Sequence, residues 1–80
     1  KSTGKDVLIT TQLRTALIFN KLVKSNNYTL ETINKTVYIF GIAMNDEEKR
    51  EVIGEANKIY DVKEVVPTIY LTSELSRNKI

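Results

Sequence analysis

The sequence predicts a single small α+β domain in the order helix, strand, strand, helix, strand, with a mixed three-stranded sheet and two helices on one face. Two observations predict this. Apolar residues with helical spacing occur near the start and again around residues 46–60, and segments rich in β-branched and aromatic residues follow each of them. Eighty residues suffice for one core, which must be held without disulfides because the chain contains no Cys.

The first helix is expected from Asp6 to about Val23. Asp6 is a suitable N-cap residue, and the polar residues 24–27 end the pattern. The apolar residues recur at i, i+4, i+7 and i+8, which places them on one face: Ile9, Leu13, Ala16 and Leu17.

Two strands are expected next, over Tyr28–Ile33 and Thr36–Ala43, with Asn34 and Lys35 as the tight turn between them. A two-residue connection makes the strands antiparallel. Such a turn is commonly of type I′, which needs positive φ at both central residues.

The second helix is expected to begin after Asn45 as N-cap. Glu48 stands three residues later and would complete a capping box, and the acidic first turn suits the positive end of the helix dipole. Its buried side would comprise Val52, Ile53, Ala56, Ile59 and Tyr60.

The last strand is expected from Glu64 to Thr72. Pro67 cannot donate a hydrogen bond to a neighbouring strand, so this strand should lie at a sheet edge. The helix before it predicts a right-handed crossover between parallel strands. The domain would then cover residues 6–72, with a linker at residues 1–5 and a C-terminal tail or linker at residues 73–80. The start of the chain lacks Met and a signal core, which indicates an excised part of a longer protein.

The composition argues against several function classes. Without His or Cys, the usual nucleophile–base pairs and nitrogen or sulfur metal sites cannot form, so no catalytic residue, metal site or cofactor is expected. The acidic residues 46–48 are better explained by the start of a helix than by a cation site. The net charge of +2 is too small to indicate nucleic acid, and no Gly-x-x-Gly clamp is present.

The outer side of the first helix is a candidate membrane surface. Arg14, Ile18 and Lys21 stand at i, i+4 and i+7 and Lys24 follows, so they should project together away from the core. A basic stripe around an apolar residue suits the headgroup region of an anionic membrane. The alternatives are that Ile18 packs on a neighbouring domain or is a single exposed aliphatic residue.

Three segments resemble one known family. They are Thr36–Gly41, with the sequence TVYIFG, the acidic-to-basic run Asn45–Arg50, and Asp61–Val65, with the sequence DVKEV. Over roughly residues 6–72 the chain resembles a BON domain. The resemblance implies a non-enzymatic phospholipid-binding or docking module of a bacterial periplasmic or envelope protein, for instance a membrane-anchored lipoprotein. Its partners would be an anionic phospholipid surface, an envelope protein, a second BON domain or another copy of the chain.

The resemblance also orients the sheet. The family pattern puts Val37 and Ile39 in the core, so alternation sends Tyr38, Phe40 and Ile42 to the uncovered face, together with Ile33, Val66 and Tyr70. An apolar face of this kind usually marks an interface. Tyr38, Phe40, Ile42 and Tyr70 are therefore the expected interface residues of the second hypothesis, a protein-interaction or self-association module without lipid affinity. The alternative is that the tail or a missing element covers the face.

The family generally has glycine where this chain has Lys35 and Asp61, both beside expected turns. Burial in one core is expected for the following residues: Ile9, Leu13, Leu17, Val37, Ile39, Ala56, Ile59, Val62, Val65, Ile69 and Leu71.

Overall fold

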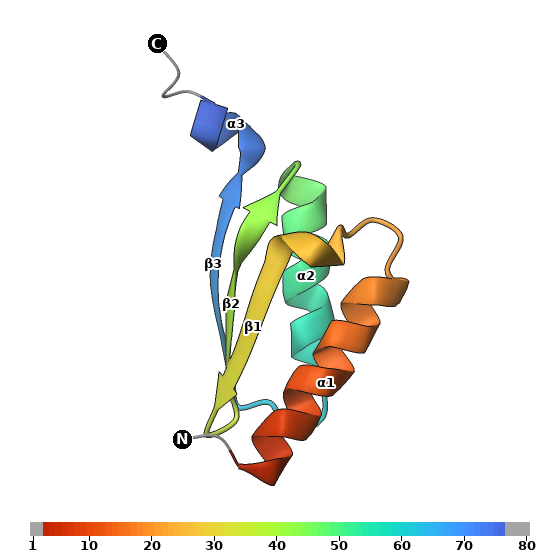
Figure 1. Cartoon of the computed structure of the whole chain (residues 1–80), viewed down its shortest axis with the longest axis vertical. Coiled ribbons are helices and arrows are strands. Elements are labelled where there is room, and N and C mark those ends of the chain that lie inside the picture. Colours follow the sequence, from red (N-terminus) through yellow and green to blue (C-terminus); the bar gives the residue numbers. More distant parts are fainter. Residues whose placement is uncertain (1–2, 77–80) are drawn as a thin grey trace.

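The computed structural model describes residues 3–76 and confirms the α+β class. Figure 1 shows a layer of strands with α1 (Gly4–Phe19) and α2 (Asp46–Lys58) on one side. The three strands are β1 (Tyr28–Ile33), β2 (Thr36–Ala43) and β3 (Glu64–Leu71), and a short 3-10 turn, η1 (Ser25–Asn27), precedes them. A five-residue helix, α3 (Thr72–Ser76), follows β3, where a frayed tail or a linker was expected.

The sheet has the order β1-β2-β3, with β1 and β2 antiparallel and β2 and β3 parallel. The predicted bounds of β1 and β2 are confirmed, and β3 ends one residue earlier than expected. Pro67 lies on an edge strand, as its missing N–H requires. Since both long helices cover the same face, the opposite face of the sheet has no covering layer among residues 3–76.

The expected start of the first helix was wrong. Thr3 is the N-cap, and its hydroxyl accepts from the Asp6 N–H while the Asp6 carboxylate accepts from the Thr3 N–H. Asp6 therefore lies within the first turn, and it is buried because its carboxylate also accepts from the N–H groups of Asn34 and Lys35. One carboxylate thus holds both the helix start and the hairpin turn.

The first helix also ends earlier than predicted, at Phe19. Asn20 is extended at the C-cap. Its side-chain NH₂ group donates to Glu51 and Glu55, and its side-chain oxygen Oδ1 accepts from the Leu22 N–H. These contacts turn the chain away from the helix axis, so residues 20–24 form a loop.

The core lies between the helices and the sheet. Of the expected core residues, Ile59, Val62, Val65 and Leu71 are only partly buried and pack at its margin. Tyr60 was wrongly expected on the buried side of α2: it is 88 % exposed, because α2 ends at Lys58. The buried hydrophobic residues are Ile9, Leu13, Leu17, Val23, Tyr28, Val37, Ile39, Ala43, Val52, Ala56 and Ile69.

Gly41 lets Tyr28 enter this core. The two residues face each other across β1 and β2, and a Cβ at Gly41 would collide with the Tyr28 ring and the Asn27 carbonyl oxygen. Only glycine leaves room for the aromatic ring to pass over β2.

Candidate functional site

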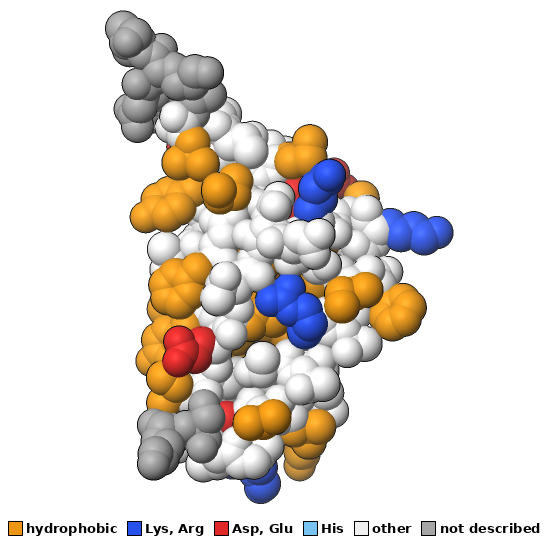
Figure 2. Space-filling model, viewed as in Figure 1, with side chains coloured by type: hydrophobic (Ala, Val, Ile, Leu, Met, Phe, Trp, Pro, Cys, Tyr) orange, Lys and Arg blue, Asp and Glu red, His pale blue; other side chains and the backbone are white. Residues whose placement is uncertain are grey.

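The first candidate surface is at the C-terminal end of α1. It consists of Ile18, Phe19, Lys21, Leu22 and Lys24, all exposed, and is called the helix-end patch below. Phe19 is 79 % exposed, the largest exposed fraction of any apolar side chain on α1. Figure 2 shows hydrophobic and basic side chains together at the right margin of the molecule, where α1 ends in Figure 1. This patch combines a protruding aromatic ring with two lysines.

The buried carboxylate of Glu48 fixes the backbone of the helix-end patch at Lys24 by a hydrogen bond. Glu48 is only 3 % exposed, and its two oxygens accept from the N–H of Met44 at 2.8 Å, the N–H of Lys24 at 3.0 Å and the hydroxyl of Tyr28 at 2.9 Å. Burial by itself raises the pKa of Glu48, but these donors outweigh it and hold the pKa below its ordinary value. Burial raises the pKa of Tyr28, and the hydrogen bond from its hydroxyl to Glu48 raises it further.

The capping box expected at α2 is therefore only half present. The Asn45 side chain accepts from the Glu48 N–H, as predicted, but the Glu48 side chain reaches past Asn45 to Met44 and the loop before β1. Glu48 joins the start of α2 to the end of the helix-end patch.

Arg14 does not belong to the helix-end patch, and its expected outward projection was wrong. Its guanidinium donates to the carbonyl oxygens of Ser25 and Tyr28, both at 2.8 Å. Arg14 thus holds the entry to β1. Lys21 was also expected on the helical stripe, but it lies in the loop beyond Phe19. Ile18 and Lys24 are exposed as expected.

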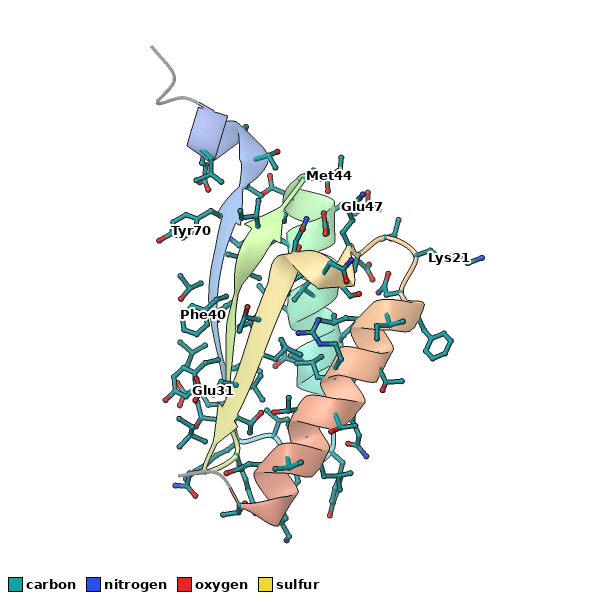
Figure 3. All side chains as sticks on the ribbon, viewed as in Figure 1. Lys21, Glu31, Phe40, Met44, Glu47 and Tyr70 are labelled. Carbon is teal, nitrogen blue, oxygen red and sulfur yellow. The ribbon has the colours of Figure 1, made fainter. Side chains whose placement is uncertain are left out.

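The second candidate surface is the uncovered face of the sheet. Phe40 is 47 % exposed and Tyr70 54 %, Ile42 is exposed, and Tyr38 is half-buried between its lateral neighbours Glu31 and Val66. Figure 3 shows Glu31, Phe40 and Tyr70 projecting on the side of the sheet away from the helices. The side chains of this sheet-face patch are Tyr38, Phe40, Ile42, Val66 and Tyr70, with Thr29, Glu31, Ile33, Thr36, Glu64 and Thr68 among and around them.

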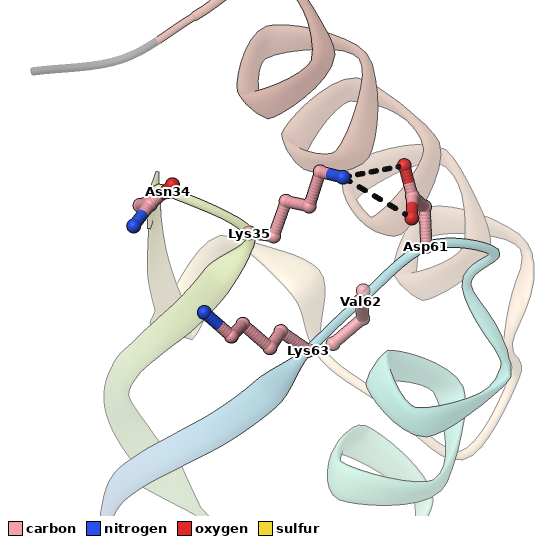
Figure 4. Close-up of a pocket in the computed structure, with 5 residues that line it drawn as sticks. All are labelled: Asn34, Lys35, Asp61, Val62 and Lys63. Carbon is pink, nitrogen blue, oxygen red and sulfur yellow. Dashed lines mark hydrogen bonds and ion pairs between the residues drawn. The ribbon is translucent and has the colours of Figure 1, made fainter.

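At the hairpin end of the sheet, three residues other than glycine have positive φ: Asn34 at 53°, Lys35 at 67° and Asp61 at 73°. The first two form the predicted tight turn, and their positive φ values are those of type I′. All three line a shallow hollow of about 340 Å³ together with Val62 and Lys63, shown in Figure 4. Lys35 and Asp61 form an ion pair at 3.3 Å across it, and Lys5 approaches Asp61 at 3.8 Å. An exposed pair of this kind contributes about 0–1 kcal/mol.

Within residues 3–76 no three acidic side chains are grouped closely enough to hold a metal ion. The carboxylates of Asp6 and Glu48 are occupied by hydrogen-bond donors of the fold. No helix in this part of the chain is long and apolar enough to cross a bilayer.

Comparison with known proteins identifies the family. The BON domain family model matches residues 5–71. The chain belongs to the BON domain family. The BON domain family is known as a family of non-catalytic domains that bind lipids or proteins. The chain is also 31 % identical over 71 residues to an uncharacterized protein in the gshII 5'region of Anaplasma centrale. The match covers 89 % of this chain and 47 % of that relative, so the chain spans about half of its length.

Phe19, Leu22 and the buried contacts of Glu48 are the features of this BON domain that the sequence did not reveal. Phe19 and Leu22 were not among the expected site residues, although each adjoins one of them, Ile18 or Lys21, in the sequence. Asn20, a polar C-cap followed by Lys21, was the available signal for the earlier end of α1. Nothing in the sequence pairs Glu48 with Lys24 and Tyr28, which are about twenty residues away along the chain and meet only in the fold.

Proposed function

We propose that this BON domain binds anionic phospholipid surfaces through the helix-end patch, as part of a bacterial envelope or periplasmic protein. The observation that carries the proposal is the pairing of Phe19, which ends α1 and is 79 % exposed, with Lys21 and Lys24 in the short loop that follows. Aromatic and aliphatic side chains enter the interfacial region of a bilayer, while lysine stems reach back to the headgroups.

The expected affinity is low. Two lysines near an anionic surface contribute about 1 kcal/mol each. Burying Phe19 contributes about 1.5–3 kcal/mol, and partial burial of Ile18 and Leu22 adds a similar amount. The sum, roughly 5–8 kcal/mol, corresponds to a dissociation constant between about 0.2 millimolar and about 1 micromolar. The parent protein would therefore need an anchor or a second binding module to stay on the membrane.

Co-sedimentation with vesicles of anionic and of neutral phospholipid tests the proposal. Wild type should bind anionic vesicles at low salt and lose binding at high salt. Phe19→Ser with Leu22→Ser, and Lys21→Glu with Lys24→Glu, should each abolish it. Matched controls are Val7→Ser with Leu8→Ser, which are exposed apolar residues at the other end of α1, and Lys58→Glu with Lys63→Glu. Equal binding to both vesicle types, or equal loss in the control variants, would refute the proposal.

A second candidate function is protein docking through the sheet-face patch. It is favoured by the exposure of Phe40 and Tyr70 on a sheet face that nothing in residues 3–76 covers. Contiguous apolar surface of this kind usually contacts a partner. Replacing Phe40 by Ser should leave lipid binding intact, so the two functions can be separated.

A further inference from the structure

All charged side chains of the sheet-face patch are negative. Its outward positions include two carboxylates, Glu31 on β1 and Glu64 on β3, and no Lys or Arg stands at any outward position of the three described strands. The acids lie toward the hairpin end, and the exposed rings of Phe40 and Tyr70 lie toward the other end. A complementary partner would therefore carry apolar side chains together with positive charge.

The helix-end patch has that chemistry. It carries Lys21 and Lys24 beside three exposed apolar side chains, and it contains no acidic residue. Figure 3 places Lys21 on the far side of the molecule from Glu31, Phe40 and Tyr70. One molecule cannot bring its own two patches together, whereas two molecules can.

We propose that the sheet-face patch receives the helix-end patch of a second copy of this chain, in a head-to-tail contact. This inference rests on the second candidate function, docking through the sheet face, and names its partner. The alternative arrangement, two sheet faces packed against each other, would bring four carboxylates into one interface with no base to pair with them. The head-to-tail arrangement instead sets two lysines against two glutamates.

The size of the surface sets the expected strength. Three strands of up to eight residues present a face of roughly 14 by 26 Å, which is about 370 Å². Stable interfaces bury about 800 Å² on each partner. The contact should therefore be weak, and it should extend into open chains of molecules because a head-to-tail contact need not close. A membrane that takes up the helix-end patch would compete with it.

The mixing of two variants tests the contact. The sheet variant is Phe40→Ser with Tyr70→Ser, and the end variant is Phe19→Ser with Leu22→Ser. Wild type should show an apparent mass above one chain at millimolar concentration, measured by NMR diffusion, and should return to one chain on dilution or in high salt. Each variant alone should remain monomeric. Their equimolar mixture should form dimers and nothing larger, because each molecule retains one intact patch.

A second pair of variants tests the charges and spares the core. Glu31→Lys with Glu64→Lys, and Lys21→Glu with Lys24→Glu, should each abolish association alone and restore it when mixed. The control is Val7→Ser with Leu8→Ser, which should associate like wild type. Far-UV circular dichroism and thermal melting establish that each variant is folded.

Three results would overturn the proposal: a monomeric wild type at millimolar concentration, association that survives in the end variant, or mixtures that fail to restore it. Survival in the end variant with loss in the sheet variant would indicate face-to-face packing instead. Vesicle binding by the sheet variant is measured in a separate experiment. Loss of self-association in that variant therefore does not decide the lipid-binding proposal, which depends on the vesicle measurement alone.

Discussion

Glu48 offers the sharpest test of how the fold supports the helix-end patch. In Glu48→Gln the side chain keeps its shape, but the amide has one acceptor oxygen in place of two. One oxygen of Glu48 serves the Met44 N–H, and the other serves the Lys24 N–H and the Tyr28 hydroxyl. Either orientation of the amide therefore points its NH₂ group at a backbone N–H. The variant leaves at least one part-buried backbone donor without an acceptor.

The expected loss in the free energy of unfolding follows from this one unpaired donor. One unsatisfied buried donor costs about 1–3 kcal/mol, so a value near 2 kcal/mol is expected. For a domain of this size that corresponds to a fall in Tm of roughly 8–16 °C. Urea denaturation and thermal melting measure it, with Glu47→Gln as the control because Glu47 is an exposed neighbour in the same helical turn. A loss equal to that of Glu47→Gln would refute the assigned role.

The pH dependence gives an independent check. The folded-state pKa of Glu48 lies below its ordinary value of 4.5. Its contribution to stability is therefore fully present above pH 4.5 and is lost as the pH falls through the folded-state pKa. Asp6 behaves in the same direction, since hydrogen bonds to the backbone outweigh its burial and lower its pKa. Stability should decline in acid, and Glu48→Gln should decline less steeply than wild type. An unchanged slope would show that Glu48 is not the titrating group.

Two further predictions concern the core and the glycines. Leu13→Ala removes a fully buried side chain and should cost about 2–5 kcal/mol; an unchanged unfolding midpoint in urea would show that the assigned core is wrong. Gly41→Ala should destabilise by about 1–3 kcal/mol because its Cβ collides with Tyr28 and Asn27. Gly54→Ala, in the middle of α2 with open space around it, should stabilise by about 0.5–1 kcal/mol. Equal effects of the two glycine substitutions would contradict the packing around Gly41.

The sequence by itself determined the elements whose signals are local. The strands Tyr28–Ile33 and Thr36–Ala43, the turn between them and the Asn45 cap depend on neighbouring residues, and all were confirmed. The type I′ turn forms with Lys35 in place of glycine because Asp6 accepts from both turn N–H groups and offsets the strain. Pro67 placed β3 at the sheet edge for an equally local reason, its missing N–H.

Only the tertiary structure decided the ends of the first helix and the surface that depends on them. Thr3 became the cap because Asp6 was required at the hairpin turn, and the helix ended at Phe19 because Asn20 found Glu51 and Glu55 on α2. The side chain of Arg14 lies against the start of β1 because it donates to the carbonyl oxygens of Ser25 and Tyr28. Each of these features depends on hydrogen-bond partners eleven or more residues away along the chain. Such hydrogen bonds form only after the helices and strands have packed together. Hydrophobic periodicity and local propensity therefore cannot predict them.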